Sequence, residues 1–170
     1  MSLQSIEVQN AVAKAKDVIA AGIVPPEMRR FQRPDLDRHG SWLLERLVKA
    51  YPHLRVAQVA GWLASMVYNN DFMFLFQPNA VGLAQMERGQ SLAPTPLVRE
   101  RFVFAREPKY VEEASWFYVE WERWAKAQGA EVMLVNEGYS DVSAEQIRAR
   151  FDNRRIFTRQ QTFLRVGEKG

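Results

Sequence analysis

A strand–loop–helix–strand segment of this chain has the residue pattern of a phosphate-binding site. A predicted strand (Leu97–Ala105) leads through a loop into a long amphipathic helix (Tyr110–Gln128), and a second strand (Glu131–Val135) follows. A strand that feeds a helix is where many α/β folds hold a phosphate-bearing cofactor on backbone N–H groups. The loop between them contains no glycine, so its backbone is less free to approach a phosphate. The order of elements favours a cofactor site, whereas the loop composition argues against one.

The composition is that of a globular protein with one core. The chain has 170 residues, of which 47% are hydrophobic and 25% charged, so it is long enough to bury a core in a single domain. No run approaches the ~18 apolar residues of a membrane span. The first residues lack the basic and apolar regions of a signal peptide. We therefore expect a cytoplasmic protein.

Several kinds of site are excluded by residue counts. The absence of cysteine removes disulfides, thiolate metal sites and a cysteine nucleophile. With only His39 and His53, both expected in turns, no metal centre is predicted. No Walker loop, nucleophile elbow or zinc-protease motif is present. The net charge of +3 supports only a weak attraction to anions.

The elements before the first hairpin are mostly helical. Apolar residues at helical spacing predict a helix over Ile6–Ala21, which a stiff Val24-Pro25-Pro26 connector follows. We expect this helix to pack on its own domain or on a neighbouring protein. Beyond it we expect an edge strand (Met28–Arg33) ended by Pro34, then helices over Trp42–Tyr51, with Ser41 as N-cap, and Val56–Tyr68.

The remaining elements complete a mixed sheet. Phe72–Phe76 and Ala80–Met86, separated by a Pro-Asn turn, predict a β-hairpin, and a loop follows at Gly89–Pro96. Ser143 and Gln146 form a capping-box pattern for a short helix to Phe151, and Arg155–Val166 is expected to be the last strand. The predicted fold is α/β, with helices on both faces of the sheet. Residues 1–24 form the N-terminal helix and connector, and residues 25–170 the domain.

In its order of elements and in several residues the chain resembles the GNAT (general N-acetyltransferase) family. The resemblance covers about Met28 to Val166. The Val81-Gly82 pair is similar to the triplet that opens the family's second hairpin strand, and the strand over Leu97–Ala105 is similar to the one that lies beside acetyl-CoA. The stretch from Trp124 to Ala130 is similar to the family's helix end. The resemblance implies a mixed, mostly antiparallel sheet flanked by helices, to which the N-terminal helix is added.

The family's diagnostic loop, Arg/Gln-x-x-Gly-x-Gly/Ala, is only partly matched. Counting back from Trp124 places Lys109, Glu112 and Ala114 on its three defining positions. Ala114 fits, and Lys109 keeps the charge without the fork of arginine. A carboxylate at Glu112 would repel a phosphate by ~4 kcal/mol at ~4 Å and an effective dielectric of ~20, or ~10³-fold in affinity. Alternatively, Glu112 and Glu113 simply stabilise the first turn of a helix through its dipole.

The resemblance also implies a cofactor and catalytic groups. It implies that acetyl-CoA is bound by residues along the strand, the helix start and the end of the following strand: Phe104, Ala105, Lys109, Ala114, Ser115 and Asn136. Acetyl transfer to an amine needs a general base and an acid for the leaving thiolate. Glu100 is the candidate base, with Glu137 second. The position of the family's tyrosine acid falls near Phe151, which has no proton to give, and Tyr118 or Tyr139 are the alternatives.

Nucleic acid is not an expected partner. The C-terminal third is rich in arginine but also carries Glu145, Asp152 and Glu168, and it has no recognised nucleic-acid motif. Its arginines are expected on a solvated surface or a protein interface. The aromatic residues Phe117, Trp121 and Trp124 recur at helical spacing and are expected in the core, whereas Trp116 falls off their line.

Two functions follow from these observations. The chain is either an acetyl-CoA-dependent N-acetyltransferase with a degenerate pyrophosphate loop, or a non-catalytic GNAT-fold structural or protein-binding module. Short GNAT-like proteins with eroded loops are known among proteins encoded by tailed bacteriophages, and this chain is similar to them in size, which makes a virion component one form of the second hypothesis. The acceptor amine or protein partner is left open, and an oligomer or larger assembly is compatible with either function.

Overall fold

The computed structural model describes residues 27–89, 96–135 and 139–151. The predicted N-terminal helix, its Val24-Pro25-Pro26 connector and the predicted strand over Arg155–Val166 lie outside the described residues, as does most of the predicted Gly89–Pro96 loop. Within the described residues, no helix is long and apolar enough to cross a membrane.

The described chain contains six strands and five α-helices. The strands are β1 (Arg29–Arg30), β2 (Phe72–Gln77), β3 (Ala80–Glu87), β4 (Leu97–Ala105), β5 (Val132–Leu134) and β6 (Tyr139–Ser140). The helices are α2 (Arg33–Ala50), α3 (Val56–Met66), α4 (Val111–Ala114), α5 (Trp116–Ala127) and α6 (Ala144–Arg150), with a 3₁₀ turn, η1 (Pro108–Tyr110), before α4. The predicted hairpin and the strand over Leu97–Ala105 are confirmed.

The sheet is mixed and mostly antiparallel, as predicted. Its strand order is β1-β2-β3-β4-β5, and β6 also pairs with β4. The pairs β1–β2, β2–β3 and β3–β4 are antiparallel, whereas β5 and β6 both run parallel to β4. The central position of β4 brings it into contact with every later strand of the described chain.

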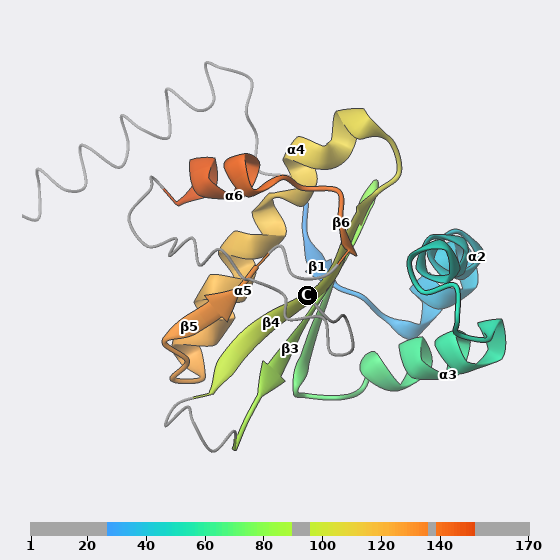
Figure 1. Cartoon of the computed structure of the whole chain (residues 1–170), viewed down its shortest axis with the longest axis horizontal. Coiled ribbons are helices and arrows are strands. Elements are labelled where there is room, and N and C mark those ends of the chain that lie inside the picture. The colour runs from blue at the N-terminus through green and yellow to red at the C-terminus, as the bar shows by residue number, and fades with distance from the viewer. Residues whose placement is uncertain (1–26, 90–95, 136–138, 152–170) are drawn as a thin grey trace, which may run out of the picture.

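Helices cover both faces of the sheet (Figure 1). Helices α2 and α3 lie on one face and bury Leu43, Leu47 and Leu63 against the phenylalanines of β2 and β4. On the other face lie α4, α5 and α6, where Phe117 and Trp121 of α5 pack against β3. The fold therefore has two apolar layers separated by the sheet, and the aromatic line predicted for the long helix is buried.

A glycine on β3 allows α5 to approach the sheet closely. A Cβ atom built on Gly82 would lie 2.7 Å from Cδ2 of Phe117 and 3.0 Å from Cζ2 of Trp121. Real carbon atoms do not approach so closely, so any larger residue would push the two rings away. The resemblance to the GNAT hairpin pointed to Gly82, and packing against α5 requires a glycine at this position.

The predicted start of α2 at Trp42, with Ser41 as its N-cap, is wrong. The helix begins nine residues earlier, at Arg33, and Pro34 lies in its first turn. Proline is tolerated there because the first N–H groups of a helix have no intrahelical partner. Asp35 caps this end by accepting a hydrogen bond from the Gln32 N–H at 2.8 Å. Consequently His39, expected in a turn, lies inside the helix.

Asp35 makes the stability of this helix end depend on pH. Arg29 binds it through two hydrogen bonds of 2.6 and 2.7 Å, and this contact holds the pKa of the buried carboxyl below its ordinary value. Because the pKa is lowered in the folded state, Asp35 stabilises the fold above its unfolded pKa and loses that contribution as pH falls through the folded pKa. In Asp35→Asn, urea unfolding followed from pH 7 downward should show a shallower acid decline than the unmodified chain. An unchanged pH profile would contradict this assignment.

One predicted helix is interrupted, and one predicted helix start is confirmed. The predicted helix over Tyr110–Gln128 is divided into α4 and α5 at Ser115, whose N–H is shared between the carbonyls of Val111 and Glu112. The predicted capping box is confirmed, because Ser143 Oγ accepts from the Gln146 N–H at 3.2 Å and α6 follows.

Candidate functional site

A bulge in β4 places two neighbouring side chains, Arg101 and Phe102, on the same face of the sheet. The pairing of β4 with β3 passes from Leu83↔Phe102 to Ala84↔Glu100, so Arg101 is the extra residue. An extra residue reverses the alternation of side chains along the strand. Glu100 accordingly lies buried near Tyr118 of α5, whereas Arg101 lines a cavity beside α2 and α3.

The opposite edge of β4 changes its partner at the same point. Residues Leu97–Arg99 pair with β5, and Phe102 and Val103 pair with β6. Asp141, directly after β6, continues this pairing: its N–H donates to Val103 O at 2.9 Å, and its Oδ2 accepts from the Ala105 N–H at 2.9 Å. The backbone groups at the end of β4 are therefore bound by the same chain.

Arg46 of α2 holds Asp141 in this position. Its Nη2 atom lies 2.6 and 2.8 Å from the two carboxylate oxygens, and its guanidinium stacks 4.7 Å from the centre of the Phe104 ring. Both charged side chains are about 30% exposed, at 31% and 28%. This ion pair ties α2, β4 and the segment after β6 together at one end of the sheet.

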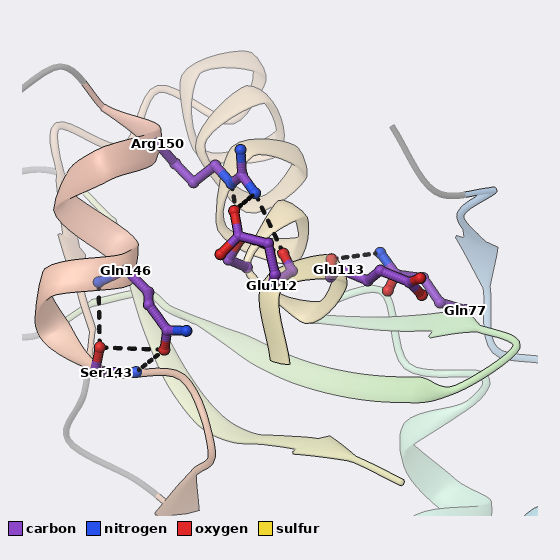
Figure 2. Close-up of polar contacts among 7 residues, drawn as sticks. Gln77, Glu112, Glu113, Ser143, Gln146 and Arg150 are labelled. Carbon is purple, nitrogen blue, oxygen red and sulfur yellow. Dashed lines mark hydrogen bonds and ion pairs between the residues drawn. The ribbon is translucent and has the colours of Figure 1, made fainter. Parts of the chain in front are cut away.

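A second ion pair binds the first turn of α4 to α6 (Figure 2). Arg150 of α6 pairs with the Glu112 carboxylate, donates from Nε to Ser115 Oγ at 2.7 Å, and stacks 4.2 Å from the centre of the Trp116 ring. From the other side, Gln77 of β2 donates to the Glu113 carbonyl at 3.0 Å. The first turn that the sequence assigned to phosphate is thus bound by side chains from two other elements.

A small cavity lies beside the Arg46–Asp141 ion pair. Its volume is about 270 Å³, and its lining includes Arg46, Asp141 and Arg106 together with the chain from Ala105 to Pro108. Arg106 is engaged by His39, whose Nδ1 lies 2.5 Å from Nη2, and by Trp42, whose ring centre lies 4.6 Å away. Burial, and then the charge of Arg106, lowers the pKa of His39.

A buried polar cluster lies beneath α5. The Tyr118 hydroxyl is 2.9 Å from Ser140 Oγ, and Glu100, only 2% exposed, is a further neighbour of that hydroxyl. Burial, and then the charge of Glu100, raises the pKa of Tyr118 well above its ordinary value. Tyr118 therefore keeps its proton and is a poor general acid for protonating a leaving thiolate.

The other predicted site residues are spread along β4 and the helix start. Phe104 and Ala105 end β4 and are 2% exposed, and Ala114 and Ser115 are fully buried. Lys109 is exposed, and its Nζ lies 3.3 Å from Glu107 Oε2, the contact that chiefly raises its pKa.

Four residues of this region were missed by the sequence interpretation of the site: Arg46, Arg101, Asp141 and Arg150. Arg46 and Asp141 are 95 positions apart, so no local pattern could have joined them. Arg150 belongs to the basic C-terminal third that the sequence did show. The predicted site residues Asn136 and Glu137 lie outside the described residues.

The three-dimensional arrangement is similar to that of solved acetyltransferases. A probable acetyltransferase superposes with a TM-score of 0.55 at 10% identity, over 84% of this chain and 99% of that chain. An aminoglycoside antibiotic 6'-N-acetyltransferase from Acinetobacter baumannii has a TM-score of 0.51 at 15% identity, over 75% and 86%. The chain has the GNAT fold.

The GNAT fold does not by itself assign an activity. A transcriptional regulator from Bacillus halodurans superposes with a TM-score of 0.52 at 9% identity, over 85% of this chain and 96% of that chain. No protein-family model matches the sequence, and no curated protein does. Because one fold supports many functions, the activity has to be argued from the residues at the site. Among the described residues, no three histidine or acidic side chains gather in a way that could hold a metal ion.

Proposed function

We propose that this chain is a non-catalytic GNAT-fold binding module rather than an acetyl-CoA-dependent N-acetyltransferase. The observation that carries the proposal is the pairing of β6 and Asp141 with the end of β4. The resemblance implies that this strand lies beside acetyl-CoA, but Val103 O and the Ala105 N–H are already bound to Asp141. The residues present at this edge do not fit the cofactor.

Opening this edge would cost several interactions at once. The pairing of β6, both contacts of Asp141 and its ion pair with Arg46 would all have to break. A net ~1 kcal/mol for each lost hydrogen bond, and more for those to charged groups, would be subtracted from any binding free energy. This cost falls on the ligand before it makes a contact of its own.

The helix start gives independent support. An arginine is the natural partner of a phosphate, but Arg150 is already neutralised by Glu112 and is only 13% exposed. The Glu112 carboxylate is 64% exposed and adds a negative charge at the place where a pyrophosphate would lie. The Ser115 N–H, a predicted phosphate ligand, bonds instead to carbonyls of its own helix.

The candidate general base is also poorly placed for catalysis. Glu100 is buried on the α5 side of the sheet, near Tyr118, whereas a second cavity, of about 530 Å³, opens on the side of α2 and α3. A general base has to lie within hydrogen-bond reach of the proton that it removes. Neither Glu100 nor Tyr118 meets that condition for a substrate in this cavity.

Calorimetry with acetyl-CoA tests the proposal directly. Titration of the full chain up to near-millimolar acetyl-CoA should give no binding heat, and the ligand should not raise the melting temperature. A micromolar dissociation constant would overturn the proposal in favour of the acetyltransferase. Lys109→Ala would then weaken binding, whereas the control Lys126→Ala, an exposed lysine near the other end of the helical segment and ion-paired with Glu122, would not.

A further inference from the structure

The cavity beside α2 and α3 has apolar walls and a basic end. It has a volume of about 530 Å³, within the usual range for small-molecule sites. Helices α2 and α3 and the turn between them supply the apolar walls, and β3 and β4 supply the polar end. Its lining residues are Leu47, Tyr51, Leu54, Gln58, Val59, Trp62, Gln85 and Arg101.

Arg101 is aimed into this cavity by the β4 bulge and held there by Gln85. The Gln85 Oε1 atom accepts from Nε of Arg101 at 2.7 Å and also from its Nη2. Because Gln85 is uncharged, this contact fixes the direction of the guanidinium without neutralising it. A fixed guanidinium suits a carboxylate better than a flexible cation does, since less side-chain entropy is lost on binding.

Arg101 is the cation that lines this cavity. The carboxylate of Glu87 lies 3.6 Å from Arg101, beyond hydrogen-bond distance, and is bound more closely by Arg99 at 2.7 Å. A ligand anion brought to the Arg101 guanidinium is attracted, whereas an ammonium group brought to the same place is repelled.

Tyr51 supplies a second polar group at this end. Burial, and then the neighbouring Tyr139, raises the pKa of Tyr51, while Arg101 is close enough to oppose that rise. The phenol thus keeps its proton at neutral pH and can donate a hydrogen bond. The Tyr139 ring lies 4.6 Å from the Tyr51 ring, edge to face, and supports its orientation.

From these contacts we infer that the cavity binds a small carboxylate with an apolar or aromatic body. The carboxylate is received by Arg101 and Tyr51, and the apolar body lies against the α2 and α3 walls that include Trp62. The inference does not rest on the proposed function, because it needs neither an open nor a closed β4 edge. It does predict that the cavity binds a carboxylate more tightly than an amine of the same shape.

A matched pair of probes tests the charge preference on the unmodified chain. Indole-3-propionate and tryptamine share a ring and a two-carbon linker but carry opposite charges. By calorimetry at millimolar concentrations, indole-3-propionate should bind at least about tenfold more tightly, the factor expected for a hydrogen bond between charged groups. Equal affinities, tighter binding of tryptamine, or no binding of either probe would overturn the inference.

A pair of variants locates the site. Arg101→Met keeps much of the apolar stem and should weaken indole-3-propionate at least about tenfold. Arg88→Met is the control, since Arg88 is an exposed arginine that pairs with Asp71 and does not line the cavity, and it should change the affinity less than about threefold. Melting curves of both variants report folding. Equal losses in the two variants would place the ligand elsewhere. The acetyl-CoA titration is a separate measurement, so either proposal can fail without the other.

Discussion

Replacing Trp121 with alanine should lower the free energy of unfolding by about 3–5 kcal/mol, the range for a large aromatic truncated in a core. Its side chain is fully buried on α5, where its ring contacts those of Phe117 and Tyr118 at centroid distances of 6.1 and 5.2 Å. Its Nε1 also donates to the Met73 carbonyl at 3.2 Å. The truncation leaves a cavity against β3 and removes this hydrogen bond.

Trp116→Ala is the matched control for Trp121→Ala. Trp116 lies on the same helix but is only half-buried, and its ring stacks beneath Arg150. Loss of that contact should cost only about 1 kcal/mol. Equilibrium urea unfolding of both variants gives the comparison. Similar losses would contradict the assignment of Trp121 to the centre of the α5 core.

Gly82→Val is expected to be the second strongly destabilising change, by about 3 kcal/mol, at the upper end of the range for overpacking. The added side chain would start from a Cβ atom 2.7 Å from the Phe117 ring and 3.0 Å from Trp121, both fully buried. Neither ring has free space behind it, so α5 itself would have to move away from β3. Urea unfolding measures the loss, and Gly82→Ala should show a smaller one of the same sign.

The control for this substitution should stabilise the protein. A Cβ atom on Gly61, exposed within α3, would meet nothing within 4 Å. Gly61→Ala should therefore raise the free energy of unfolding by about 0.5–1 kcal/mol, because alanine has the higher helix propensity. If Gly82→Ala were also stabilising, the close approach of α5 to β3 would be wrong.

The sheet was largely predictable because its strands carry strong local signals. The β2–β3 hairpin has two apolar runs on either side of a Pro-Asn turn, and the predicted bounds differ from the observed ones by one residue at their ends. The bounds of β4 were predicted correctly. By contrast, β6 has only two residues, and it exists because its backbone meets β4 rather than because of its own composition.

The helix boundaries show that one residue type can indicate either of two structures. Pro34 was interpreted as the end of a strand, but the same ring that stops a strand is suited to the first turn of a helix. The side chain that decided between them is Asp35, whose partner Arg29 comes from β1. A polar residue such as Ser41 is a plausible N-cap by type alone, and only tertiary contacts exclude it.

The candidate site was less predictable than the fold. Placing Glu100 and Arg101 requires knowledge of the bulge, which arises from the pairing of β4 with β3 and leaves no mark in either strand's composition. Glu112 was recognised from its position in the loop, and the structure adds the partner, Arg150, that makes it part of a closed contact. Long-range ion pairs of this kind depend on the packing of whole elements.

The short strands at the two margins of the sheet have a consequence for the behaviour of the protein at high concentration. Within the described residues, β1 has two residues, β5 three and β6 two. A long free strand edge offers unpaired N–H and C=O groups to a strand of another molecule, which is how edge-to-edge aggregation begins. By covering the end of β4, β6 and Asp141 leave little backbone for such pairing. The segment that closes this edge to a ligand thus also keeps one copy of the protein from adding to the sheet of another.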